Sequence, residues 1–180
     1  MINSAGYLSA FSYEGIEINR AQPAQLTGKV PDQKAARLLT EFGLPQQLGD
    51  DVFFHDIVSS CITMGEQLRE VGGATPTEVD DLLYLGAGVR AGVLLLNGRT
   101  GEVLSWSNEQ TTLINTHLQL FLEFICGIQE KINELEEAEG LPGGTYDELI
   151  DRVLRSLAVI DPQAPAQSGD YWDGMLRSLL

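Results

Sequence analysis

The sequence predicts an α+β domain in which a mainly antiparallel sheet is flanked by helices. Residues 82–106 contain three apolar runs separated by turn residues, and Asn97-Gly98 lies between the second run and the third. Asn-Gly between apolar runs is a strong hairpin signal, because glycine accepts the positive φ of such turns. Residues 118–135 then repeat apolar side chains at three- and four-residue steps, which indicates a long helix able to cover the sheet. The length of 180 residues suits a single domain over 1–180.

The N-terminal third predicts one clear helix. Residues 1–31 are a loosely patterned N-terminal extension, in which residues 11–18 fit an edge strand. Asp32 is a suitable N-cap, because its carboxylate can accept hydrogen bonds from the free amides of a first helical turn. We expect that helix over residues 33–42, and Gly43 is a suitable stop.

The central third predicts the sheet. Residues 51–64 are rich in β-branched and aromatic side chains and indicate one or two strands. Residues 82–85, 92–96 and 102–106 supply the others, for a sheet of roughly four to six strands. The glycines of residues 86–92 resemble a phosphate-binding loop, but such a loop needs a helix directly after it. A strand follows instead, so we interpret this segment as a bend or bulge.

The C-terminal third predicts three helices. The long helix could be capped by Thr111, Thr112 or Asn115, and it ends at Gly140, before a tight break over 141–144. Its buried stripe is Leu118, Phe121, Leu122, Ile125, Ile128, Ile132 and Leu135. A second helix starts at the capping box of Thr145 and Glu148 and runs to about Ile160. In the C-terminal segment 163–180, a link over 163–169 precedes a short helix at about 171–179, which packs on the body.

The net charge of −15, from 26 acidic and 11 basic residues, bears on partners. It repels nucleic acid and anionic lipid and attracts cationic surfaces. Acidity can also serve solubility alone, so charge leaves both interpretations open. No apolar run approaches the roughly 20 residues of a membrane-spanning helix, and the first residues lack a signal-peptide pattern. We therefore expect a cytoplasmic protein that binds neither membrane nor nucleic acid directly.

No catalytic set is visible in the sequence. His55, His117, Cys61 and Cys126 are the only histidines and cysteines, and no pair has the spacing of zinc ligands. A serine or cysteine nucleophile also needs a well-placed histidine, which the pattern does not supply. We expect structural roles for all four residues, with free, buried thiols. The sequence predicts no catalytic residue, no metal site and no cofactor.

Acidic and aromatic residues are the remaining candidates for a site. The acidic candidates are Asp50, Asp51, Asp56, Glu78, Asp80 and Asp81. They allow three interpretations: paired-carboxylate or cation chemistry, solvated surface, or a docking surface for a basic partner. Tyr84, Trp106 and Trp172 are either core residues or interface anchors, and core is favoured for Trp172.

Several short motifs resemble, in order and spacing, the SUKH superfamily of immunity proteins, type-four class. They are the helix ending in Gly-Leu-Pro over residues 38–45, Leu85-Gly86 with residues 100–103 of the hairpin, residues 114–121 at the start of the long helix, and Ile160-Asp161-Pro162 followed by Trp172. The resemblance covers about residues 35–175. His117 stands where a small polar residue is usual, and the residues before 32 have no clear match.

The resemblance implies an α+β fold with a curved sheet, and an immunity protein that binds and occludes a polymorphic toxin without doing chemistry. The implied target is a nuclease or nucleic-acid deaminase domain. Such enzymes present lysine and arginine to phosphates, so an acidic surface complements them. The expected contact surface is Asp50, Asp51, Asp56, Glu78, Asp80, Asp81 and Glu102, with Tyr84 and Trp106 as anchors.

Two alternatives remain at this stage. One is a regulatory or scaffold module of the same fold, which binds proteins without a toxin. The other is a small enzyme or ligand-binding domain, which needs a deep apolar cavity with converging polar groups. The toxin's identity and the oligomeric state cannot be deduced from this pattern.

Overall fold

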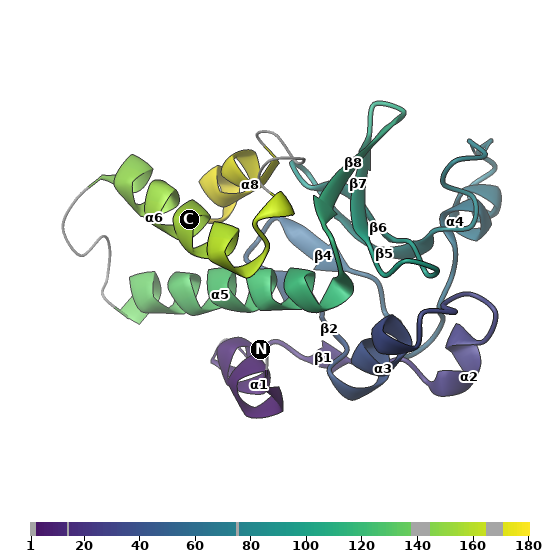
Figure 1. Ribbon diagram of the computed structural model, residues 1–180, viewed down its shortest axis with the longest axis horizontal. Helices are drawn as coiled ribbons and strands as arrows, with labels where there is room; N and C mark the ends of the chain where they lie inside the picture. Colours follow the sequence, from purple (N-terminus) through teal and green to yellow (C-terminus); the bar gives the residue numbers. More distant parts are fainter. Residues whose placement is uncertain (1–2, 14, 75, 138–144, 165–170) are drawn as a thin grey trace.

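A six-stranded antiparallel sheet forms the centre of the protein, which confirms the α+β class (Figure 1). The computed structural model describes residues 3–13, 15–74, 76–137, 145–164 and 171–180. The strands follow one another in chain order: β3 (Gln47–Leu48), β4 (Val52–Phe54), β5 (Leu83–Gly88), β6 (Gly92–Leu96), β7 (Val103–Ser107) and β8 (Gln110–Asn115). A separate pair joins β1 (Ile18–Asn19) to β2 (Leu44–Pro45).

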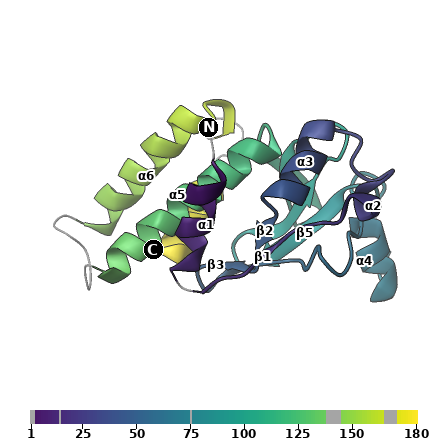
Figure 2. The same cartoon turned by 90° about the horizontal axis from the view of Figure 1, so that it is seen from below.

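Helices lie on both sides of this sheet. They are α1 (Ser4–Ser12), α2 (Pro23–Leu26), α3 (Gln33–Glu41), α4 (Met64–Glu70), α5 (Leu118–Glu137), α6 (Tyr146–Ile160) and α8 (Tyr171–Leu179). Figure 1 shows α5, α6 and α8 together at the left and α4 at the right, with α2 and α3 below it. In Figure 2, α1 lies against α5, and these two helices are in contact. No helix in the described ranges is long and apolar enough to cross a membrane.

The sheet buries its two faces unequally. Side chains on the inner face, such as Leu83, Leu94 and Val103, join the main core with α5. Leu95 lies on the outer face and joins a smaller cluster with Met64 of α4. Successive residues of a strand point to opposite faces, so the run of three buried leucines in β6 serves both cores.

The predicted hairpin between β6 and β7 is confirmed, but its glycines act differently from expectation. The positive φ is at Gly101, at 78°, whereas Gly98 is needed for close approach. A Cβ atom on Gly98 would lie 2.1 Å from the carbonyl oxygen of Lys29, so the hairpin packs against the segment after α2. The adjacent β7–β8 turn has positive φ at Asn108 and Glu109, which is typical of a two-residue hairpin turn.

The local start signals of two helices are also confirmed. Asp32 caps α3 by accepting hydrogen bonds from the backbone amides of Lys34 and Ala35, both at 3.2 Å. Thr145 and Glu148 form the predicted capping box of α6. The stripe on α5 is buried as expected apart from Leu135, which is half-buried. The predicted end of this helix at Gly140, the break over 141–144 and most of the 163–169 link lie outside the described residues.

Two predicted elements were wrong. The expected strand over residues 11–18 is absent except at Ile18, which belongs to β1. Residues 11–12 instead end α1, because Tyr7, Ala10 and Phe11 recur at helical spacing and are buried. Thr111 and Thr112 do not cap the long helix, since they pair with β7 in β8, which also includes Asn115. The expectation of one or two strands within residues 51–64 is confirmed by the three-residue strand β4. An isolated bridge at Thr63 follows it, and α4 starts at Met64.

Gly86 lies in the predicted bulge, where the β5–β6 register shifts between Tyr84 and Gly86. A Cβ atom here would lie 2.4 Å from the carbonyl oxygen of Phe53 in β4. We expect Gly86→Ala to lower the free energy of unfolding by about 2–3 kcal/mol, because backbone must move to relieve the clash. Urea unfolding followed by circular dichroism measures this loss. Gly127→Ala, with nothing within 4 Å of the added atom, is the control and should be neutral or stabilising; equal effects of the two changes would contradict the argument.

Candidate partner-binding surface

The outer face of the sheet carries a row of side chains that crosses five strands. Phe53 pairs with Ala87, Ala87 with Val93, Val93 with Trp106, and Trp106 with Thr111. Paired residues of antiparallel strands project to the same face, so these five side chains lie side by side. We call them the outer row.

Coverage of the outer face decreases toward the outer row. A neighbouring row, which includes Tyr84 and Leu95, packs under α4 with Met64 and Val79. In the outer row, Val93 and Trp106 are half-buried, whereas Phe53 in β4 is 57% exposed. The sheet therefore presents an apolar strip that α4 leaves partly uncovered.

Two predicted aromatic anchors belong to this face. The Tyr84 ring stacks at a tilt on His55 with ring centroids 5.4 Å apart, and burial raises the pKa of its hydroxyl. Trp106 packs against the outer cluster, and its indole Nε1 has no hydrogen-bond acceptor among the described residues. Both side chains are half-buried, so they combine packing with partial access.

Three predicted acids lie in the segment that leads to β5. Glu78 and Asp80 flank Val79, whose fully buried side chain belongs to the outer cluster. Asp80 accepts an ion pair from Arg69 at 2.9 Å. Glu78 and Asp81 are exposed and form no ion pair with any described residue. The segment leading to β5 thus places acidic side chains near Tyr84 at the start of β5, whereas Trp106, through its pairing with Val93, lies level with Ala87 near the other end of that strand.

The remaining predicted acids are dispersed. Asp50 and Asp51 lie in the β3–β4 turn, next to the C-terminal end of β5, whereas Asp81 precedes the start of that strand. Asp51 also accepts a hydrogen bond from Ser178 at 2.9 Å. Asp56 follows β4, and a hydrogen bond from Ser59 lowers the pKa of its carboxyl. Glu102 accepts a hydrogen bond from Thr100 at 2.6 Å. The structure therefore does not unite the seven acids in one patch.

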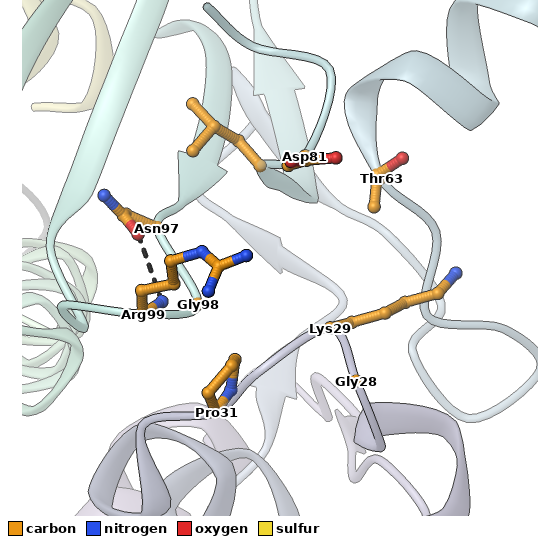
Figure 3. A pocket seen from close by; sticks show the side chains of 9 residues that line it. Gly28, Lys29, Pro31, Thr63, Asp81, Asn97, Gly98 and Arg99 are labelled. Atoms are coloured by element: carbon orange, nitrogen blue, oxygen red, sulfur yellow. Dashed lines mark hydrogen bonds between the residues drawn. The ribbon is translucent and has the colours of Figure 1, made fainter.

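A cavity of about 360 Å³ opens where the β6–β7 turn meets the start of β5 (Figure 3). The guanidinium of Arg99 projects into it, with Asp81 and Thr63 on the opposite wall. Lys29 also lines the cavity, but its ammonium pairs with Glu66 at 2.5 Å. Its lining, among the described residues, includes no histidine or cysteine that could serve as base or nucleophile. This arrangement suits a polar or charged group rather than a large apolar ligand.

The histidines and cysteines have structural partners. Nδ1 of His117 accepts from the Gln119 amide at 3.2 Å, so Nε2 donates to Asp32 at 3.1 Å and ties α5 to α3. Burial raises the pKa of Cys61 to about 11 and that of Cys126 to about 12, which leaves both as unreactive thiols at neutral pH. Within the described ranges, no three metal-ligating side chains converge.

Phe53 is the surface residue that sequence reasoning missed. Its two neighbours, Val52 and Phe54, are buried in the main core. The three residues are all apolar, so the sequence carries no alternation that would mark the middle one as outward-facing. The only available signal was the two-residue period of a strand, which places Phe53 opposite its neighbours.

The motifs that carry the family resemblance meet around the start of α5. Asp161 accepts from the Thr116 amide at 2.9 Å and from its hydroxyl at 3.0 Å. Trp172 donates from Nε1 to the Ile114 carbonyl at 3.0 Å, and the Leu118 amide donates to Gly101 at 2.7 Å. These motifs therefore hold the fold together and do not form a reactive site.

Comparison with known proteins identifies one family. The model of one family, described as SUKH-4 immunity protein, matches residues 9–178. No curated protein and no solved structure matches the chain. Since the family match extends over nearly the whole sequence, the chain belongs to the SUKH-4 immunity protein family.

Proposed function

We propose that this chain is the immunity partner of a toxin domain that processes nucleic acid, a nuclease or a deaminase, and that it acts in the cytoplasm. It binds the toxin and occludes its cationic active site, and it performs no reaction itself. Family membership is the observation that carries this proposal. The net charge of −15 supports it, since a toxin that binds phosphates must present lysine and arginine.

The contact surface in this proposal combines acids with the aromatic anchors. Tyr84 and Trp106 pack against the outer cluster, and Glu78 and Asp80 flank Val79 of the same cluster along the chain. The proposed contact residues are Asp50, Asp51, Asp56, Glu78, Asp80, Asp81, Tyr84, Glu102 and Trp106. The dispersed acids add to the field that steers a basic partner, because exposed charges act over about 8–10 Å at physiological salt.

Co-expression with the toxin domain encoded beside this chain tests the proposal. We expect co-expression to rescue growth and the two proteins to co-purify. Calorimetric titration should show affinity falling on the order of tenfold between about 50 and 500 mM salt, because salt screens the charge attraction. A toxin-like neighbour that neither associates at low salt nor loses toxicity would contradict the proposal.

A regulatory or scaffold module of the same fold is the second candidate. The exposed Phe53 and half-buried Trp106 favour protein binding under either function. The neighbouring reading frame separates them, since an immunity protein needs a toxin gene beside its own and a scaffold module does not.

A further inference from the structure

We propose that the uncovered outer row, centred on Phe53 and Trp106, is the docking surface for the toxin, and that it accepts a segment presenting an apolar side chain flanked by lysine or arginine. The inference rests on the proposed function. It goes beyond it by selecting one face of the molecule, one anchor that the sequence did not indicate, and one partner chemistry.

The exposure of Phe53 is the first observation. Eight large apolar side chains in the described ranges are markedly exposed, and Phe53 is the only one of them within a strand. At 57% exposure, with both strand neighbours in the core, its ring contributes little to the fold. An exposed aromatic ring in an acidic protein gains nothing for solubility.

Continuity of the apolar strip is the second observation. Phe53 is joined through Ala87 to Val93 and Trp106 by direct pairing across the sheet. Single exposed apolar residues are ordinary, whereas a contiguous strip beside polar groups is typical of a binding surface. Strand pairing also holds the strip rigid, so a partner pays little ordering entropy to bind it.

The charge around the strip defines the partner. Residues 38–89, which contain β4, α4 and β5, hold nine acidic residues and one basic residue, Arg69. Arg69 is already paired with Asp80 at 2.9 Å. Asp50 and Asp51 lie in the turn that precedes Val52 and Asp56 follows β4, so acids adjoin Phe53 on both sides along the chain, and the nearest base in sequence after β5 is the exposed Arg90 of the β5–β6 turn. Such a border favours a segment that carries lysine or arginine beside its apolar side chain.

The same charge disfavours other occupants. A second copy of this chain would bring two strongly acidic borders together, which costs free energy through like-charge repulsion. Nucleic acid and anionic membranes are repelled for the same reason. A basic protein segment is the occupant that satisfies both the apolar strip and its border.

Paired variants of Phe53 and Val159 test the docking face. Val159 lies on α6 in the other helical layer and is 82% exposed, so it is a matched exposed apolar control. The probe is the toxin domain encoded beside this chain, titrated calorimetrically into each folded variant. We expect Phe53→Ala to weaken binding about tenfold and Phe53→Lys about a hundredfold, while Val159→Ala and Val159→Lys change it less than about twofold. Thermal unfolding of each free variant verifies that the fold is retained.

A charge variant provides a second readout. Glu78→Gln with Asp81→Asn should slow association about three- to tenfold at low salt and reduce its salt dependence. Glu136→Gln with Glu137→Gln, at the far end of α5, should leave the rate nearly unchanged.

The outcomes separate the two proposals. Toxin binding that resists both Phe53 changes, or that falls equally with Val159, would overturn the docking face while the immunity function stands. Failure of the unmodified protein to bind the toxin would overturn the immunity function and this inference together.

Discussion

Replacing Trp172 with alanine is expected to lower the free energy of unfolding by about 3–5 kcal/mol. The side chain is 1% exposed and packs against Phe121 and Phe124 of α5, with ring centroids 6.4 and 5.0 Å away. Its Nε1 also donates to the Ile114 carbonyl in β8 at 3.0 Å. Truncation therefore creates a cavity between α8, α5 and the sheet and leaves a buried carbonyl without its donor.

Equilibrium unfolding in urea, followed by circular dichroism, measures the effect. Trp172→Phe is the matched variant, because it keeps an aromatic ring in the site and loses the indole donor. We expect it to cost about 1–2 kcal/mol, since a lost hydrogen bond and a smaller ring cost less than an empty site. A loss below about 1 kcal/mol for Trp172→Ala would show that α8 does not close the core as described.

Replacing Asp161 with alanine is expected to cost about 3 kcal/mol, because its carboxylate serves several donors at a buried position. The residue is 2% exposed and follows α6, where Oδ2 accepts from the amide and hydroxyl of Thr116 and from Asn115 at 3.4 Å. Removal leaves these donors unsatisfied inside the protein. It also releases the link between the end of α6 and the start of α5.

Two further variants make this prediction specific. Asp161→Asn keeps one acceptor oxygen and should recover about half of the loss. Asp151→Ala removes an exposed aspartate from the same α6 and should change stability by less than about 0.5 kcal/mol. Chemical denaturation of the three variants in parallel provides the comparison, and equal losses for Asp151 and Asp161 would contradict the proposed role of the buried carboxylate.

The sequence determined the elements whose signals are local. Asp32, Thr145 and Glu148 satisfy amides within one turn of themselves, so their caps depend on no distant residue. The apolar stripe of α5 is likewise visible at helical spacing. Family membership was accessible for the same reason, because motifs such as Ile160-Asp161-Pro162 keep their order along the chain.

Two elements whose identity depends on distant partners were predicted wrongly. Residues 11–12 are helical because Tyr7 and Phe11 pack in a core that also contains α5 side chains. Thr111 and Thr112 form a strand because β7 is beside them. In both places tertiary packing outweighed a weak local preference.

The proposed binding face depends on tertiary structure alone. The sequence identified Tyr84 and Trp106 as aromatic candidates and the acids as charged candidates. Those residue types determined the partner chemistry that we expect, an apolar group with basic neighbours. It could not show that Asp50 and Asp51 lie at the other end of the sheet from Asp81, or that α4 stops short of Phe53. Strand period fixes which side a residue faces, but its exposure depends on which distant helix covers that side.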